Sequence, residues 1–496
     1  MGQPLPPPPM LKHKLNREVS WIPKKVSNGA MVAYLVALFA CSIIFNQYAM
    51  EWFGWAFGIV GVLLFFYYSN LLSWRWANKG HRTFEKKLFR TSLLIRVVYV
   101  IFSYFFYFYM TGAHFEFSAA DVLGYHESAR YAAELIRQGD WHLISNIMDY
   151  SGCAYSDAGY PAYLAIVYLI TGDSVLIARL IKAVFSAWTV VLMYKLAQRN
   201  FGESVGRMTA ILCMLMPNLI FYCGLHLKEI EMVFLAVLFC ERADYIMRKG
   251  KLAFGPTAGL MLIPFALFFI RTALAAVLVL AFLMALLLSS THVVSWGKRV
   301  IILLIAVSFS GYIVFENTAI GGEVQDMWKT KGSKQETNME WRSQRKDIKG
   351  YTQKYARYAS AAVFAPLIFT IPFPTMTETY GQENQRLING GNFCKNITSF
   401  FTILAIAMLV ISKKWRKYVL PLAILGGYLM VLVFSNFAHS ERFHLPSIPF
   451  ALMFAAYGMT FWGSKKVKYG YYVWLGLMVV AVIAWNWFKL SGRGMI

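Results

Sequence analysis

The chain has 496 residues, of which 58% are apolar and 15% are charged, and its mean hydropathy is +0.49. Soluble domains carry about 25% charged residues, so these values exclude a set of soluble domains and indicate an integral membrane protein. Six Cys are too few for a disulfide scaffold of this length. The net charge of +23 would suggest nucleic-acid binding in a soluble protein. In a membrane protein, the distribution of this charge among the connections between spans must be considered first.

Thirteen apolar segments are long enough to cross a bilayer core of about 30 Å. They lie at residues 29–49, 52–73, 91–112, 175–197, 206–226, 229–247, 254–270, 272–290, 299–315, 397–412, 418–437, 444–462 and 471–488. The shorter apolar stretches 159–171 and 359–374 are bordered or interrupted by Pro and are predicted to be re-entrant or interfacial. The sequence therefore predicts an all-α polytopic membrane protein.

Basic residues are concentrated in alternate connections. The N-terminal tail 1–28 and the connections 74–91, 195–207, 241–251, 291–299, 413–417 and 464–468 hold 27 Lys and Arg against five Asp and Glu, which accounts for +22 of the net charge of +23. Because positive loops stay in the cytoplasm, the N-terminus is predicted to be cytoplasmic and, after thirteen spans, the C-terminus external. The orientation in the membrane then explains the positive net charge, and nucleic-acid binding is not needed to account for it.

Two connections on the predicted outer side are long. Residues 113–160 carry seven acids and two bases, against the basic trend of the chain, and residues 316–396 are mixed and polar. We accordingly divide the chain into a cytoplasmic tail with two spans (1–90), a core of spans that includes the acidic loop (91–315), the long second loop and the C-terminal spans (397–496).

Charged residues gather at the outer ends of the predicted spans. They are Asp121, Arg179, Lys182, Lys228, Glu229, Glu231, Arg271, Glu441 and Arg442. Ionisable groups at membrane depth are costly, so their convergence on one side suggests a site for an anionic head group together with a general base.

The individual roles stay open at this level. Ser118–Arg137 has the pattern of an amphipathic helix, and Asp121 in its first turn is either a base or only a favourable partner of the helix dipole. Arg442 either binds phosphate with its guanidinium fork or is an interfacial Arg that extends to the membrane surface. Lys228 and Glu229 could equally pair with each other.

The cysteines give one further hypothesis. Four of the six lie in predicted spans, whereas Cys153 and Cys394 fall in the two long outer connections. Oxidation is possible on that side, so we expect a disulfide between them that fixes the long loop over the first one.

Several motifs occur in a familiar order. They are DVLGYHESARYAAELIRQGDW from Asp121, GYPAY from Gly159, GDSVLIARL from Gly172, Lys228-Glu229, and ERFHLPSIP from Glu441. Together they resemble the GT-C superfamily of membrane glycosyltransferases, most closely the branch related to protein O-mannosyltransferases and lipid A aminoarabinose transferases. The resemblance covers residues 91–250 and 439–449. It departs at Val122, where the family often has Glu after the Asp, and the WWD-type motif of oligosaccharyltransferases is absent.

The resemblance implies a GT-C fold with about 13 transmembrane helices and an inverting transfer of sugar. The donor would be a polyprenyl-phosphate-linked sugar and the acceptor a lipid, glycan or protein, at the extracytoplasmic face of the bacterial inner membrane. The implied site consists of Asp121 as the base, of Arg442, Lys228 and Arg271 at the donor phosphate, and of Glu229, Tyr125 and His126 at the acceptor or a metal ion. The sequence requires no cofactor, and a divalent metal ion is compatible with it.

Two other functions compete with this one. A cell-surface polysaccharide polymerase or ligase also uses lipid-linked glycans but lacks the acid after the first core span, so it would gain if Asp121 were dispensable. A transporter or flippase for lipid-linked sugars would need ionisable residues near the middle of the bilayer, whereas those seen here cluster at span ends.

Overall fold

The computed structural model describes residues 20–117, 119–249, 254–289, 365–378, 381–435, 440–491 and 495–496. Every regular element within these residues is a helix. The α-helices are α1 (Lys24–Ile44), α2 (Trp52–Arg75), α3 (His81–Thr111), α4 (Ala120–Arg137), α5 (Leu143–Ser151), α6 (Tyr155–Thr171), α7 (Val175–Phe201), α8 (Glu203–Leu215), α9 (Pro217–Phe221), α10 (Glu229–Lys249), α11 (Phe254–Leu288), α15 (Glu383–Leu387), α16 (Asn389–Ile411), α17 (Val419–Phe434), α18 (Glu441–His444), α19 (Ile448–Met459) and α20 (Lys465–Ser491). Short 3-10 turns are η1 (Asn46–Tyr48), η2 (Tyr222–Gly224), η3 (Trp415–Tyr418), η4 (Leu445–Ser447) and η5 (Thr460–Gly463).

Nine helical stretches of the described residues are long and apolar enough to cross a membrane, and the bent pair of α8 with α9 would be a tenth. The prediction of an all-α polytopic protein is confirmed. The number is below the predicted thirteen because α11 counts once although it breaks in two, and because the charged helix α10 does not pass the same test. The predicted span 299–315 and most of the loop 316–396 lie outside the described residues.

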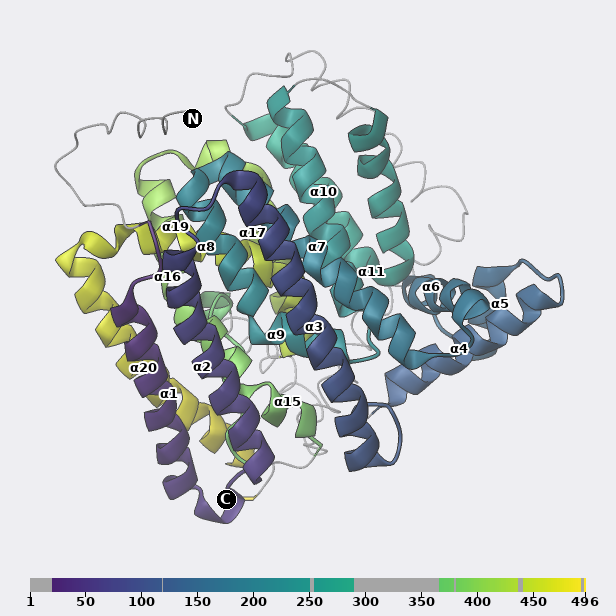
Figure 1. Ribbon diagram of the computed structural model, residues 1–496, viewed down its shortest axis with the longest axis horizontal. Coiled ribbons are helices and arrows are strands. Elements are labelled where there is room, and N and C mark those ends of the chain that lie inside the picture. The colour runs from purple at the N-terminus through teal and green to yellow at the C-terminus, as the bar shows by residue number, and fades with distance from the viewer. Residues whose placement is uncertain are drawn as a thin grey trace, which may run out of the picture.

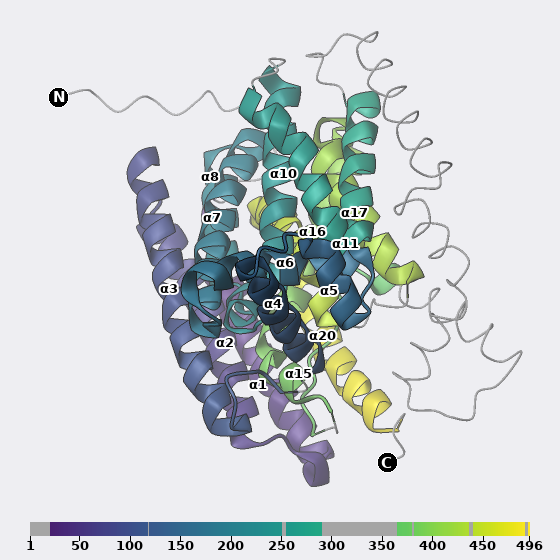
Figure 2. The same ribbon diagram turned by 90° about the vertical axis from the view of Figure 1, so that its right-hand side faces the viewer.

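The long helices form one bundle, and three shorter helices leave it sideways. Figure 1 shows α3 running down the front of the bundle and α4, α5 and α6 projecting to the right at about mid-height, and Figure 2 shows these three helices from the front. Helix α6 packs against both α11 and α4. The pattern of α4 predicts an apolar face of Val122, Tyr125, Ala129, Ala132 and Ile136; all of these are buried except Tyr125, which is half-buried. Ser118 lies outside the described residues.

A buried arginine stabilises the break between α8 and α9, which are bent by 50°. Pro217 begins α9 and has no backbone N–H, so the carbonyl of Cys213 lacks its normal helical donor. Arg96 of α3 is fully buried and donates to the carbonyls of Cys213 and Met214 at 3.3 and 3.2 Å, and to Ser186 Oγ at 2.6 Å. The break is thereby satisfied inside the bundle, where unpaired backbone groups are costly.

Helix α11 breaks at Arg271, as the division between the predicted spans 254–270 and 272–290 requires. Arg271 has φ −164° and ψ 89°, an extended conformation between two helical segments. Helix α6 approaches this break closely, because a Cβ at Gly159 would lie 2.8 Å from the backbone of Phe269. Only a glycine permits this contact, which brings the projecting helices against the break.

The disulfide hypothesis is wrong. Cys153 and Cys394 are both free thiols. Helix α16 begins at Asn389, so Cys394 lies inside a helix and is fully buried, whereas the sequence placed it in an outer loop.

The positions of α5 and of the turn after α16 predict labelling from opposite sides of the membrane. Ser151 ends α5, and Lys414 follows α16; both are exposed. In a Cys153→Ser background, a cysteine at Ser151 should react with an impermeant maleimide in intact cells. A cysteine at Lys414 should react only after the membrane is opened. The other five native thiols are buried and should stay silent, as the chain without either new cysteine will verify. Labelling of both sites from the same side would contradict this arrangement.

Candidate functional site

The side chains of Asp121, Glu229 and Arg442 meet at the end of the bundle where α3 ends. Asp121 is in the first turn of α4, Glu229 begins α10 and Arg442 is in α18. The Nη1 of Arg442 donates to Asp121 Oδ2 at 2.6 Å, and its Nε donates to Glu229 Oε1. The Glu229 side chain is 3% exposed and that of Asp121 is 60% exposed. Arg442 is therefore anchored on its buried side and paired with an accessible carboxylate on the other.

A cavity of about 330 Å³ opens beside this pair. Its wall is built from four segments of the chain, which are residues 116–122 with Asp121, 222–227, 381–385, and 440–443 with Arg442. Its volume lies at the lower end of the range of small-molecule sites. The wall is rich in carboxylates, amides and one guanidinium, which suits a polar ligand such as a sugar.

Lys228 and Arg271 flank the same region. The Nζ of Lys228 donates to the carboxylate of Asp157 and to the carbonyl of Ile270 at 2.8 Å, and it lies 5.6 Å from the ring centre of Tyr125. Burial lowers the pKa of Lys228, and the Asp157 carboxylate opposes that shift. Lys228 is thus a buried cation beside the break in α11.

The ring of Phe443 joins Arg271 to the arginine of the cavity wall. The guanidinium of Arg271 lies 4.5 Å from the Phe443 ring centre, and that of Arg442 lies 5.8 Å from it. Phe443 and Arg442 line the cavity, whereas Arg271 contacts the Phe443 ring without lining the cavity itself. An anionic ligand beside Phe443 would lie near both guanidinium groups.

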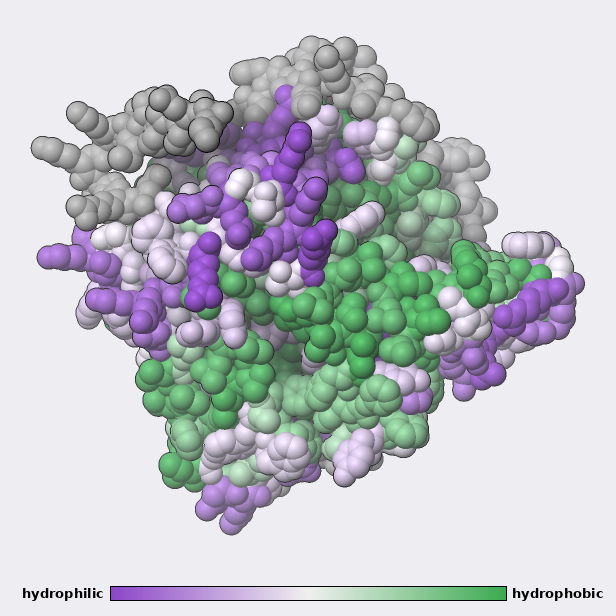
Figure 3. Space-filling view, viewed as in Figure 1, coloured by the Kyte–Doolittle hydropathy of each residue, from purple (hydrophilic) through white to green (hydrophobic). Residues whose placement is uncertain are grey.

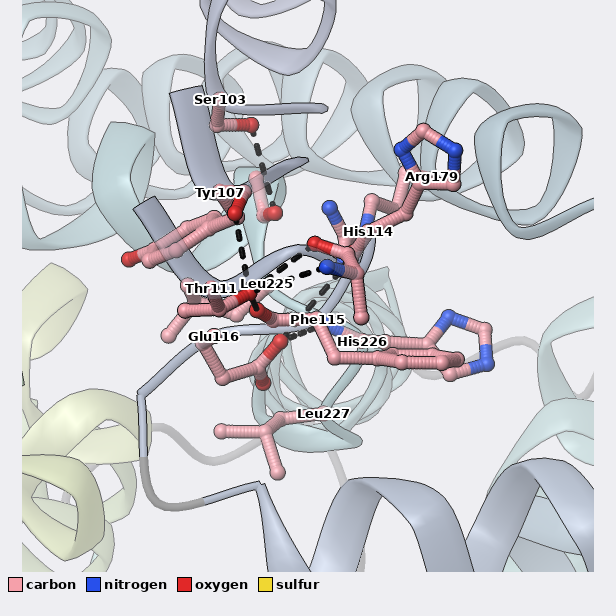
Figure 4. Close-up of polar contacts among 12 residues, drawn as sticks. Ser103, Tyr107, Thr111, His114, Phe115, Glu116, Arg179, Leu225, His226 and Leu227 are labelled. Carbon is pink, nitrogen blue, oxygen red and sulfur yellow. Dashed lines mark hydrogen bonds and ion pairs between the residues drawn. The ribbon is translucent and has the colours of Figure 1, made fainter. Parts of the chain in front are cut away.

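Two cations of α7 bind the loops that precede α4 and α10, the helices that carry Asp121 and Glu229. Arg179 donates to the carbonyl of His114 at 2.8 Å and to Glu116 Oε2 at 3.3 Å, and the same carboxylate oxygen accepts from the backbone N–H of His226 (Figure 4). Both Arg179 and Glu116 are buried. One turn further, Lys182 donates to the carbonyls of Leu225 and Leu227. These two α7 cations, which the sequence grouped with the site, therefore position its loops.

His126 is directed toward α6 and is not among the residues of the cavity wall. Its Nδ1 is 2.8 Å from the hydroxyl of Tyr168, which in turn lies 3.1 Å from Nε2 of His226. Burial and, next, the charge of Arg130 lower the pKa of His126. Through its hydrogen bond to Tyr168, the His126 imidazole links α4 to α6.

The fit of a divalent metal ion can be tested on the carboxylates of the site. Among the described residues, no three His, Cys, Asp or Glu are grouped so that they could hold a metal. Asp121 and Glu229 both contact Arg442, and Glu229 Oε2 is a single buried oxygen with no hydrogen-bond partner in the described part of the chain. That the sequence requires no cofactor and is compatible with a divalent metal ion stays a prediction.

Sequence reasoning missed several neighbours of the site. Asp157 was only one of seven acids in a loop, yet it pairs with Lys228. Tyr222, Asn384 and Gln385 line the cavity, and no motif singled them out. In the sequence, the one feature that could have distinguished Asp157 from the other acids was its position shortly before Gly159 and Pro161.

The comparisons with known proteins agree with this picture. The sequence model of the Alg9-like mannosyltransferase family, which belongs to the GT-C superfamily, matches residues 378–495, about a quarter of the chain. Over this part of the chain, the match supports the resemblance to GT-C membrane glycosyltransferases that the ordered motifs indicated. The matched part contains Arg442 but neither Asp121 nor Glu229. No curated protein and no solved structure matches the chain.

The buried ion pair of Arg179 and Glu116 predicts a large effect on folding. Arg179→Met leaves the Glu116 carboxylate buried without its charge partner and should cost about 3–5 kcal/mol of stability. The measurement is the thermal unfolding midpoint of the purified protein in detergent. Adding Glu116→Gln should recover part of the loss, because an amide is cheaper to bury than a charge. A single variant as stable as the double variant would contradict the structural role.

Proposed function

We propose that the protein transfers a sugar, with inversion, from a polyprenyl-phosphate-linked donor to a hydroxyl group of a lipid, glycan or protein. The reaction would take place at the extracytoplasmic face of the bacterial inner membrane. The observation that carries the proposal is the position of Arg442, shared by the accessible Asp121 and the buried Glu229 on the wall of the cavity. The match to a family of mannosyltransferases supports the transfer of a lipid-linked sugar.

The proposed step is a single displacement. The acceptor oxygen forms a bond with the anomeric carbon while its proton passes to the carboxylate of Asp121. The bond between the anomeric carbon and the phosphate oxygen breaks, and its electron pair leaves with the polyprenyl phosphate. Arg442, with Lys228 or Arg271 nearby, stabilises the charge that develops on the phosphate.

The contact between Asp121 and Arg442 suggests how donor binding prepares the base. A donor phosphate would compete with Asp121 for Nη1 of Arg442, whereas the bond from Nε to Glu229 would keep the guanidinium in place. A fork held at one edge can bind phosphate with the other. Asp121 would then be free to accept the acceptor proton only when donor is present.

Asp121→Asn should lower turnover by about 10²–10⁴-fold, since the amide keeps the shape but cannot accept the proton. Donor binding should be kept or strengthened, because the amide competes less than the carboxylate for Nη1 of Arg442. The assay uses purified, folded protein with a panel of radiolabelled polyprenyl-phosphate-linked hexoses and pentoses, and a membrane extract as the acceptor source. Asp149→Asn, an exposed acid of α5, is the matched control and should behave as wild type. A fully active Asp121→Asn enzyme would remove the base assignment and favour the polymerase or ligase function.

Arg442→Lys should weaken donor binding and also lower turnover, by about 10- to 100-fold in kcat/KM, because charge remains but the bidentate fork is lost. Donor affinity is measured beside turnover, and Arg416→Lys, an exposed arginine at the other end of the bundle, is the control. The thermal midpoint identifies any variant that fails to fold. Unchanged donor affinity in folded Arg442→Lys protein would contradict phosphate binding by this residue.

A further inference from the structure

A second hollow lies at the opposite, basic end of the bundle. It is a groove of about 690 Å³ between α3 and α10, with α7 as its floor. Figure 3 shows hydrophilic side chains over the upper ends of these helices and an apolar area below them. The groove is separate from the sugar-transfer site, and none of its residues takes part in the proposed reaction.

Polarity changes along the groove in the same direction on two of its helices. On α7, Trp188, Leu192 and Lys195 follow one another at helical spacing, so two apolar side chains lead to a cation. On α10, Phe234 and Leu238 lead in the same way to Arg242. Trp188 is 53% exposed although it lies in a helix that can span a membrane. One half of the groove is therefore apolar and the other half is basic.

The basic half carries a clear excess of positive charge. Glu85 is its one carboxylate, and it is paired with Lys195 at 2.8 Å. Arg82, Lys86 and Arg90 of α3 line the same groove and have no ion pair among the described residues. Their spacing of four residues aligns them on one face of α3. The rule that positive loops stay inside accounts for cations at this end, but it does not require three of them to face an apolar trough.

We propose that this groove binds one anionic phospholipid. The phosphate of its head group would lie between the cations of α3 and Arg242, and an acyl chain would follow the apolar trough over Trp188 and Phe234. Basic pockets between transmembrane helices recognise anionic head groups in this way. A lipid fits better than a soluble anion, because the basic half continues directly into an apolar half.

A bound lipid would connect α3 to α10 across α7. Helix α3 ends just before the loop that carries Glu116, and α10 begins at Glu229. The lipid should therefore raise the stability of the whole bundle without contacting the sugar-transfer site.

The test compares phosphatidylglycerol with phosphatidylcholine on delipidated full-length protein in detergent. Lys86→Gln together with Arg90→Gln removes two charges and should weaken phosphatidylglycerol binding by about 30-fold, at about 1 kcal/mol per cation. Native mass spectrometry reports the bound lipid, and the thermal midpoint reports its stabilising effect. The control is Lys465→Gln with Lys466→Gln, two exposed cations at the start of α20.

The expected result is that phosphatidylglycerol binds to and stabilises the wild type and the control, and does so far less for the groove variant. Equal midpoints in phosphatidylcholine verify that the groove variant is folded. Three results would overturn the proposal. They are equal binding of phosphatidylglycerol by all three proteins, no preference over phosphatidylcholine, and full stabilisation by inorganic phosphate or glycerol phosphate alone, which would indicate a site for a soluble anion.

Discussion

The arrangement of the proposed sugar-transfer site depends on the guanidinium of Arg442. It contacts Asp121 and Glu229, which are 321 and 213 residues away in the chain. Because Glu229 is buried and Asp121 is accessible, one edge of the guanidinium is fixed and the other faces the cavity. Without Arg442, the buried Glu229 carboxylate would carry an uncompensated charge. The contact therefore joins α18 to α4 and α10.

The loops that meet at Arg442 are held by positive charges inside the bundle. Arg179 and Lys182 lie one turn apart on α7 and bind the two loops that lead to Asp121 and to Lys228. Arg96 satisfies the break before the second of these loops. In a membrane each of these cations needs its partners, because unpaired charges and carbonyls are costly there. Their geometry is therefore specific, and the two loops arrive in fixed positions.

The two ends of the bundle suit different tasks. At the end where α3 stops, carboxylates and cations converge on a cavity of sugar size, and Arg442 is joined there to Asp121 and Glu229 in ion pairs. At the other end, the cations of α3 exceed the acids and border an apolar trough. The positive charge of this chain is thus the basis of its predicted orientation, and it also creates a surface that is complementary to anionic lipid.

The sequence by itself determined the all-α membrane class, the break at Arg271, the apolar face of α4 and the set of charges at one end of the spans. These features depend on local hydropathy and on helical spacing, which a single chain displays directly. Only the tertiary structure decided which charges meet: Arg442 with Asp121 and Glu229, Arg179 with Glu116, and Lys228 with Asp157. The sequence also placed Cys394 in a loop, whereas the start of α16 buries it. The pairing of distant side chains depends on how helices pack and where loops cross, and a linear pattern holds no distance between them.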